Sequence, residues 1–466
     1  MKRIAAQITS ACTSFALKHV FKRPAANFPG KLALYIDPHI INLADTKLET
    51  GSFIVVGTNG KTTVTNLLAQ TLERAGKRVI CNTSGANLNS GIATSILQGK
   101  PAHWGVFECD ELWLAHVTPD LQPTYVVLLN LFRDQLDRCG EIASIQESII
   151  KALQASPKTC LIYNADDPFC AHIAKSVSNP ILSFGIAEDL KLTQNLVPDA
   201  SLCQECSSML NYEYYQYGQL GLYTCPSCSF KRPVLDFKAQ AIQRTEAALN
   251  FHISLHNEPL YSLSIPFTGT YMIYNILALA SAASRAGVDM QVLQESISSF
   301  NPSNGRLQHF SIPAKQIISS SPEEAQKGAV KVLLNLAKNP TGFNQNIRLL
   351  PKEDIPCSIA FFVNDKEGDG RDVSWLWDID FEELNSRKQL RVFAGGMRAL
   401  DLAVRLKYAG LSPQLVANTR EVLTQSSHLF HSSPEETSVF VIGNYTALPS
   451  LRNELTSLNS QPKTKE

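Results

Sequence analysis

The chain has 466 residues, of which 44% are hydrophobic and 18% are charged, a composition typical of a globular protein of about three domains. Lysine plus arginine number 42, as do aspartate plus glutamate, which argues against a protein whose main task is to coat nucleic acid. No apolar run approaches the roughly 18 residues needed to cross a bilayer, which argues against a membrane-spanning protein.

The first 45 residues are expected to form a lead-in to the first domain. Five apolar residues in 1–23 recur near helical spacing between basic ends: Ile4, Ile8, Ala11, Phe15 and Val20. A helix packed on the protein body is favoured over a helix on a membrane surface. Residues 24–45 contain three prolines and a glycine and are expected to be irregular.

A glycine-rich turn follows the first predicted strand, residues 53–56. It reads Gly57-Thr58-Asn59-Gly60-Lys61-Thr62-Thr63, and a helical pattern begins at Thr62. Backbone N–H groups at such a turn bind phosphate, the lysine adds a positive charge, and the first threonine hydroxyl can hold Mg²⁺. All seven residues are therefore candidates for nucleotide binding. A strict P-loop would have glycine where this chain has Val55, so the loop is a shortened variant.

Strands and helices alternate after this turn. Apolar residues mark one face of a helix over residues 64–75, and strands are predicted at 78–81, 104–107, 125–129 and 161–163. A helix that joins two strands in this way forms a parallel crossover, so a parallel α/β domain is predicted over residues 46–312. Glu108, Asp110 and Glu111 follow one strand end, where carboxylates facing a triphosphate bind Mg²⁺. For Asp110 and Glu111, a solvated turn is an equal alternative.

Four of the eleven cysteines form two CxxC pairs. These are Cys203-Gln-Glu-Cys206 and Cys225-Pro-Ser-Cys228, separated by residues 207–224, the spacing of a zinc ribbon. Four thiolates leave no open position for water, so a Zn²⁺ ion here would be structural. Redox pairs or idle thiols are the alternative. The ribbon is predicted as an insert at about residues 198–235, and the other cysteines as core residues of a reducing compartment.

A third domain is predicted over residues 313–450, followed by a polar tail at 451–466. Strand-like runs at 359–363, 391–394 and 439–442 each end in a small or polar loop, which is typical of a second doubly wound sheet. Between them, the stretch from Asp369 to Asp378 holds two of the four tryptophans beside three carboxylates. Taken alone, this stretch is best interpreted as an aromatic plug between domains.

The order of these segments resembles the Mur ligase and folylpolyglutamate synthetase superfamily, whose ATP loop residues 57–62 match. The implied fold is α/β: a Mur ligase-like P-loop central domain with an inserted four-cysteine zinc ribbon, plus a Rossmann-like α/β C-terminal domain. The resemblance also implies bound ATP and Mg²⁺, with Glu108 and Thr62 as magnesium ligands, Asn275 near the adenine and Arg306 on a phosphate. Where the family has a metal-binding histidine this chain has Gln135, so a second Mg²⁺ with the usual ligands is not implied.

Three features resemble one branch of these ligases: the ribbon, the segment from Lys338 to Asn344, and Asp372-Val-Ser-Trp-Leu-Trp-Asp378. Members of that branch amidate the α-carboxylate of D-glutamate in the lipid II stem peptide, through an acyl phosphate. Their ammonia comes from a separate GatD-like glutamine amidotransferase subunit, which implies a heterodimer. An aspartate of the third domain completes the partner's Cys-His pair. In this chain the resemblance assigns that role to Asp372, with Asp378 as the alternative. The implied catalytic residues are therefore Lys61, Glu108 and Asp372.

Alternatives stay open at this point. A ligase that adds an amino acid to a carboxylate would share the loop and the domains, and a zinc-ribbon NTPase or scaffold would share the ribbon. The ribbon as a docking surface for a partner is compatible with the main interpretation. The expected location is the cytoplasm, with a peripheral position at the inner membrane face as an option.

Overall fold

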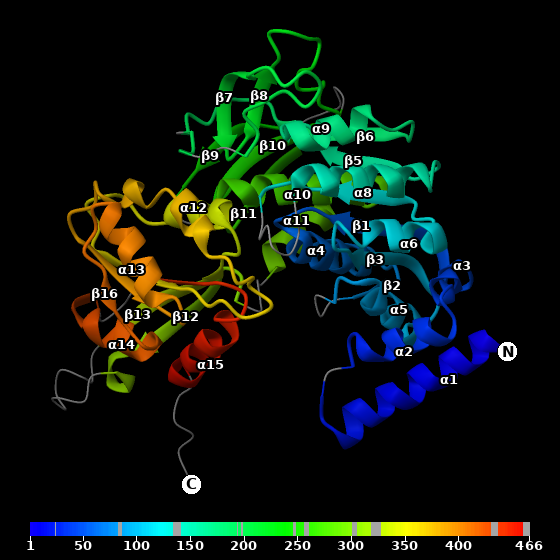
Figure 1. Cartoon of the computed structure of the whole chain (residues 1–466), viewed down its shortest axis with the longest axis horizontal. Helices are drawn as coiled ribbons and strands as arrows, with labels where there is room; N and C mark the ends of the chain where they lie inside the picture. The colour runs from blue at the N-terminus through cyan, green and yellow to red at the C-terminus, as the bar shows by residue number, and fades with distance from the viewer. Residues whose placement is uncertain are drawn as a thin grey trace. The chain divides into compact units, whose positions relative to one another are not determined.

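The computed structural model describes residues 1–23, 25–82, 86–133, 141–192, 194–196, 199–245, 248–255, 261–300, 305–317, 328–429 and 437–459. The chain forms two compact units (Figure 1). Unit 1 comprises Met1–Phe132, Cys139–Gln194 and Pro198–Phe300, and unit 2 comprises Arg133–Arg138, Asn195–Val197 and Asn301–Glu466.

The N-terminal segment is helical and belongs to unit 1. Its elements are α1 (Lys2–Phe15), the π-helical turn η1 (Ala16–Val20), α2 (Phe28–Ile36), the 3₁₀ turn η2 (Ile40–Leu43) and α3 (Ala44–Lys47). The expectation of an irregular lead-in over residues 24–45 is therefore wrong. Pro29 lies in the first turn of α2, where a missing N–H costs nothing, and the N–H of Gly30 donates to Thr94 Oγ1 at 2.9 Å.

Unit 1 is built on a nine-stranded sheet in the order β11-β10-β9-β6-β5-β4-β1-β3-β2. The strands from β2 to β9 in this order run parallel, and β10 and β11 are antiparallel additions. Their bounds are β1 (Leu48–Val56), β2 (Val79–Cys81), β3 (Ala102–Glu108), β4 (Tyr125–Leu128), β5 (Cys160–Asn164), β6 (Ile181–Ile186), β9 (Phe237–Arg244), β10 (Leu249–Leu255) and β11 (Tyr261–Ile265). The parallel α/β domain predicted from the sequence is confirmed.

Helices cover both faces of this sheet. One face packs on α5 (Asn89–Gln98), α6 (Leu114–Leu121), α8 (Ile142–Gln154) and α9 (Pro168–Lys175), around Ile54, Val126 and Leu161. The other face carries α4 (Lys61–Arg74), α10 (Thr270–Arg285) and α11 (Met290–Ser299), which pack on one another. Because β1 lies between β3 and β4 while α4 leads away to β2, the loop after β1 opens at a topological switch point of the sheet.

The cysteine pairs flank a hairpin of β7 (Asn211–Tyr217) and β8 (Leu220–Thr224), inserted between β6 and β9. Isolated bridges join Leu202 to Met209 and Thr224 to Lys231, so each pair lies in its own short turn. The predicted ribbon insert is present.

Unit 2 holds a six-stranded sheet in the order β12-β13-β17-β14-β15-β16, parallel except for β12. The strands are β12 (Gln308–Pro313), β13 (Ala329–Leu336), β14 (Cys357–Phe362), β15 (Leu390–Gly395), β16 (Gln414–Leu415) and β17 (Thr437–Gly443). The helices are α12 (Pro340–Ile347), α13 (Ala399–Tyr408), α14 (Thr419–Gln425) and α15 (Leu448–Asn459), with short turns η3 (Ala314–Gln316), η4 (Ser374–Asp378), η5 (Phe381–Leu384) and η6 (Ser427–Leu429).

Alternate residues of β14 enter two cores, one with Ile359 and Phe361 and one with Ala360 and Phe362, so both sheet faces are covered. This is the second doubly wound sheet predicted from the sequence.

Two boundaries differ from those expected. Strand β12 pairs with β13, so the domain predicted to begin at residue 313 starts earlier. The sequence pattern of this single antiparallel edge strand did not reveal it. The expected polar tail begins inside α15, which buries Leu451, Leu455 and Leu458.

Within the described ranges, no helix is both long enough and apolar enough to cross a membrane.

Candidate functional site

The glycine-rich loop connects β1 to the N-terminus of α4 in a conformation that two glycines make possible. Gly57 has φ +135° and Gly60 has φ +93°, values that side-chain-bearing residues rarely adopt. A Cβ on Gly57 would lie 3.0 Å from the backbone of Asn130, and one on Gly60 would lie 2.4 Å from Asn275 Oδ1. The two glycines therefore allow the loop to pack closely between neighbouring segments while α4 begins at Lys61.

The loop after β4 fixes the glycine-rich loop from one side. The N–H of Thr58 donates to the carbonyl of Asn130 at 2.9 Å, and the N–H of Asn59 donates to Asn130 Oδ1 at 2.9 Å. Asn130 Nδ2 returns a bond to the Asn59 carbonyl at 3.0 Å. The N–H of Phe132 donates to Thr58 Oγ1 at 2.9 Å. These reciprocal bonds hold Thr58 and Asn59 before any ligand binds.

A carboxylate accepts hydrogen bonds from the glycine-rich loop on its other side. Glu111 Oε1 accepts from the N–H of Gly57 at 3.1 Å and from Lys61 Nζ at 2.8 Å. Lys61 Nζ also donates to the Gly57 carbonyl at 2.5 Å. Burial alone would lower the pKa of Lys61, but the charges of Glu111 and Glu108 raise that pKa above its ordinary value. The alternative of a solvated turn is wrong for Glu111, which is buried.

Thr62 and Glu108, the predicted magnesium ligands, lie together. Thr62 Oγ1 donates to Glu108 Oε2 at 2.7 Å, so a hydroxyl and a carboxylate meet at the start of α4. Asn82 orients Glu108, because its Oδ1 accepts from the Glu108 N–H at 2.8 Å and its Nδ2 donates to the Glu108 carbonyl at 2.8 Å. Two hard oxygen ligands beside a phosphate loop are the set that Mg²⁺ takes when phosphates and water complete its shell. The residues fit the ion.

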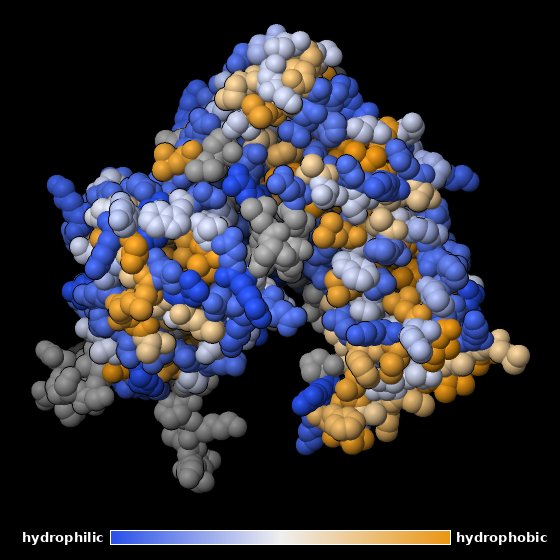
Figure 2. Space-filling view, viewed as in Figure 1, coloured by the Kyte–Doolittle hydropathy of each residue, from blue (hydrophilic) through white to orange (hydrophobic). Residues whose placement is uncertain are grey.

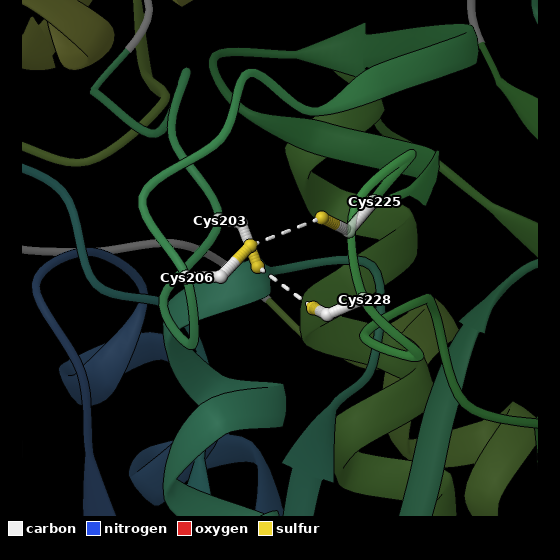
Figure 3. A group of neighbouring side chains, drawn as sticks. All are labelled: Cys203, Cys206, Cys225 and Cys228. Atoms are coloured by element: carbon white, nitrogen blue, oxygen red, sulfur yellow. Dashed lines mark hydrogen bonds between the residues drawn. The ribbon is translucent and has the colours of Figure 1, made fainter.

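The four cysteines of the ribbon converge (Figure 3). Their sulfur atoms all lie within 4.8 Å of one another, with 3.6 Å between Cys203 and Cys228 and 3.5 Å between Cys206 and Cys225. A tetrahedral site with Zn–S bonds of about 2.3 Å places its sulfurs roughly 3.8 Å apart, so the cluster fits zinc. Backbone N–H groups donate to Cys203, Cys225 and Cys228 sulfurs at 3.4–3.5 Å, which favours the thiolates.

The ribbon hairpin packs on the loops that surround the phosphate site. Gln219 Nε2 donates to the Leu131 carbonyl at 2.7 Å, and the rings of Phe132 and Tyr217 stack with centroids 5.7 Å apart. Leu131 and Phe132 directly follow Asn130, the residue that binds Thr58 and Asn59. The ribbon therefore supports the phosphate loop indirectly, through the residues that follow Asn130.

Two buried aspartates anchor the ribbon to the sheet. Asp166 pairs with Arg232 at 3.2 Å and accepts from Tyr274 Oη at 2.7 Å. Asp167 accepts from Gln219 Nε2 of the ribbon at 3.4 Å, caps α9 through the Phe169 N–H at 3.0 Å and accepts from the Leu131 N–H at 2.8 Å. Burial raises the pKa of Asp167 to about 7. The sequence alone revealed neither this role of Asp167 nor that of Gln219, because neither residue follows a recognisable spacing.

Other predicted site residues are placed as follows. Asn275 is buried in α10 with its side chain against Gly60, and Thr63 lies in the first turn of α4. Arg306 belongs to unit 2, so its contact with a phosphate stays a prediction. The segment with Gln135, residues 134–140, and Asn304 lie outside the described residues.

In unit 2, the rival acids lie at the turn η4: Asp372 precedes it and Asp378 is its last residue. Asp372 is exposed and accepts from the N–H of Ser374 at 2.8 Å and from Ser374 Oγ at 2.9 Å. Asp378 pairs with Arg133 at 3.4 Å within the same unit. Both tryptophans pack in unit 2: Trp375 contacts Phe343 with ring centroids 5.4 Å apart, and Trp377 contacts Tyr408 at 5.5 Å.

Known proteins with similar sequences cover the chain almost end to end. The Mur ligase middle-domain family model matches residues 55–224, and the MurT ligase C-terminal model matches residues 336–448. The chain is 31% identical over 439 residues to the MurT subunit of lipid II isoglutaminyl synthase (glutamine-hydrolyzing) from Streptococcus pneumoniae, covering 93% of this chain and 92% of the relative. The subunit of the same name from Staphylococcus aureus is 30% identical, with 94% of each chain covered.

Solved structures share the fold at low sequence identity. A pseudomurein peptide ligase type C from Methanothermus fervidus superposes with a TM-score of 0.66 at 19% identity, over 88% of this chain and 79% of that one. MurF from Acinetobacter baumannii gives 0.65 at 16% identity, over 92% and 80%. The Mur ligase-like fold is confirmed.

Proposed function

The chain belongs to the MurT family, and we propose that it is the synthetase subunit of a lipid II isoglutaminyl synthase. It amidates the α-carboxylate of D-glutamate in the lipid II stem peptide to D-isoglutamine, at the expense of ATP. The observation that carries this proposal is the full-length similarity to subunits of that name, on a chain whose phosphate loop is intact.

The reaction follows from carboxylate chemistry. A carboxylate does not react with ammonia at neutral pH because its carbon is a poor electrophile. Transfer of the γ-phosphoryl group from ATP gives an acyl phosphate and ADP. Ammonia attacks the acyl carbon, the C–O bond to phosphate breaks, and one proton of the nitrogen passes to the leaving phosphate, so the amide and hydrogenphosphate are released.

The described residues supply charge and position for this reaction. Lys61 and the N–H groups of the loop bind the β- and γ-phosphates once these displace Glu111, and the loop does not reorganise because Asn130 already holds it. Thr62 and Glu108 would hold Mg²⁺, and a bound ion would supply charge neutralisation for the phosphates. Asn275 borders the nucleotide and Arg306 contacts a phosphate. The four-cysteine cluster of the ribbon holds a structural Zn²⁺ ion.

The ammonia comes from a glutamine amidotransferase subunit, GatD-like, that binds unit 2. Asp372 supports this assignment because its exposed carboxylate is held in one orientation by Ser374, as the third member of a catalytic triad requires. Asp378 is the weaker candidate, because Arg133 already neutralises it.

An apolar surface next to Asp372 is the proposed docking site of this subunit. Leu400, Val404 and Tyr408 form one stripe of α13, and all three are exposed. Trp377, five residues after Asp372, packs on Tyr408 and extends the stripe towards η4. Apolar side chains are visible over α13 in Figure 2.

From this reaction we expect the complex to act in the cytoplasm, at the inner face of the membrane that holds the substrate.

The test is reconstitution. The chain is purified with a co-expressed glutaminase subunit and incubated with lipid II, ATP and either glutamine or ammonium chloride, and the product is identified by mass. We expect a one-to-one complex and a product lighter by about 1 Da, the difference between –OH and –NH₂, from both nitrogen donors. Addition of an amino acid in place of ammonia, or product formation without ATP, would overturn the proposal.

A further inference from the structure

Helix α1 packs on the protein with the side opposite to the one its sequence predicts. Its buried residues are Ala6, Ser10 and Ser14, which face α2 and α5. These side chains are small, and Ser14 Oγ accepts from Gln98 Nε2 at 2.9 Å. The helix expected from the sequence is present and packs on the body, through these small residues and not through its large apolar ones.

Those large residues point outwards instead. Ile4, Ile8 and Phe15 are 62%, 59% and 64% exposed, and a spacing of four and seven residues places them on one side of the helix. Val20 and Phe21, at the end of η1, are exposed as well. Figure 2 shows apolar side chains over the N-terminal helices at the lower right of the molecule. Exposed apolar stripes of this kind mark interaction surfaces.

The charged side chains of residues 1–36 are all basic, and directly after them Asp37 pairs with Arg3 at 3.7 Å. Residues 1–36 contain no aspartate or glutamate, although the whole chain has 42 acidic and 42 basic residues. The same segment contains six basic residues: Lys2, Arg3, Lys18, Lys22, Arg23 and Lys31. An apolar stripe inside a basic segment is complementary to a bilayer of anionic lipids, which has negatively charged headgroups above an apolar interior.

A second copy of the chain is the alternative partner for the apolar stripe of α1. Pairing two α1 stripes would bring two basic segments together, and the repulsion opposes that contact. Spanning is also disfavoured, because Ser10, Ser14 and neighbouring polar residues lie along the opposite side of the helix.

We infer that α1 and η1 form a peripheral membrane-binding element that lies on an anionic bilayer, with Ile4, Ile8 and Phe15 inserted among the lipids. The inference rests on the proposed function and deepens it, because it names the element that brings the ligase to a membrane-embedded substrate. Its test nevertheless uses vesicles without that substrate, so a failure here is distinguishable from a failure of the ligase assignment.

The experiment is flotation of the full chain with vesicles of phosphatidylglycerol and phosphatidylcholine, or of phosphatidylcholine alone. We expect binding to the anionic vesicles that weakens with salt, and little binding to the neutral ones. The triple substitution Ile4→Ser, Ile8→Ser, Phe15→Ser should reduce binding by about tenfold or more. Replacing Lys2, Lys22 and Arg23 by serine should remove the preference for anionic vesicles.

The matched control is Met209→Ser, Val234→Ser, Tyr261→Ser, which removes three exposed apolar side chains elsewhere in unit 1 and should float like the wild type. Unchanged thermal unfolding of the apolar triple variant checks that its fold is intact. Equal flotation of the wild type and that variant would overturn the inference. A wild-type dimer that the same substitutions split, without vesicle binding, would overturn it in favour of contact between copies.

Discussion

The phosphate loop of unit 1 and the Asp372 turn of unit 2 hold their polar groups in different ways. Asn130 and Glu111 bond to the phosphate loop from two neighbouring loops, and the ribbon braces the Asn130 side. Asp372 is exposed, is held by a serine two residues away, and lies in the same segment as the exposed Trp377. The phosphate loop is held by residues of its own unit and can act without another chain. Asp372, an exposed and oriented acid beside an apolar surface, is suited to act on groups of another chain.

The largest expected effect tests whether the phosphate loop serves every reaction of the complex. Lys61→Ala removes the charge that faces the phosphates and should reduce amidation by about a thousandfold or more, with glutamine and with ammonium alike. The initial rate with each donor is the measurement, and Lys77→Ala, an exposed lysine of unit 1, is the control. A near-normal rate with ammonium would remove the loop from the ligase reaction.

The second effect should separate the two regions. Asp372→Asn keeps an acceptor for the Ser374 N–H but removes the charge that would orient a histidine, so glutamine-driven amidation should fall by about a hundredfold or more. Ammonium-driven amidation should stay within about twofold. Asp378→Asn is the matched comparison and should change neither rate strongly. If both rates fall together in Asp372→Asn, this acid belongs to the ligase step or to folding.

A third effect probes the support of the phosphate loop. Removing zinc with a chelator, or Cys225→Ser with Cys228→Ser, should release Gln219 and Tyr217 from the loop after β4. ATP affinity should then fall by about tenfold, a typical coupling between packed sites, and the thermal midpoint should drop. Titration calorimetry measures the affinity, and Cys12→Ser, an exposed cysteine outside the ribbon, is the control. An unchanged affinity in a zinc-free protein would limit the ribbon to another task.

The smallest effect concerns the carboxylate that fills the loop. Glu111→Gln keeps the shape and the acceptor for Gly57 but removes the charge that competes with phosphate. ADP binding should strengthen about fivefold, while Glu73→Gln, on the exposed side of α4, should leave it unchanged. Weaker binding to the Glu111 variant, restored by excess Mg²⁺, would instead make Glu111 part of the metal site.

Local patterns predicted much of unit 1, and long-range packing decided the remainder. Strand, turn and helix around Gly57–Thr63 follow from apolar periodicity and two glycines, and the ribbon follows from cysteine spacing. The spacing of Glu108, Asp110 and Glu111 did not reveal that Glu111 turns inwards, because its partner Lys61 begins a helix that is distant in sequence. In α1 the helical period was predicted correctly but the buried side was not, since small residues pack closely on α2 and α5.

Glu111 has one further consequence for the phosphate loop. A carboxylate attached to the same chain competes at an effective concentration on the order of millimolar, and dilution does not remove it. A lone phosphate or sulfate offers the loop little more than Glu111 already does. Under the proposed function, a triphosphate with Mg²⁺ would add contacts at Thr62, which Glu111 does not contact. We therefore expect Glu111 to compete more effectively with small anions than with a polyphosphate.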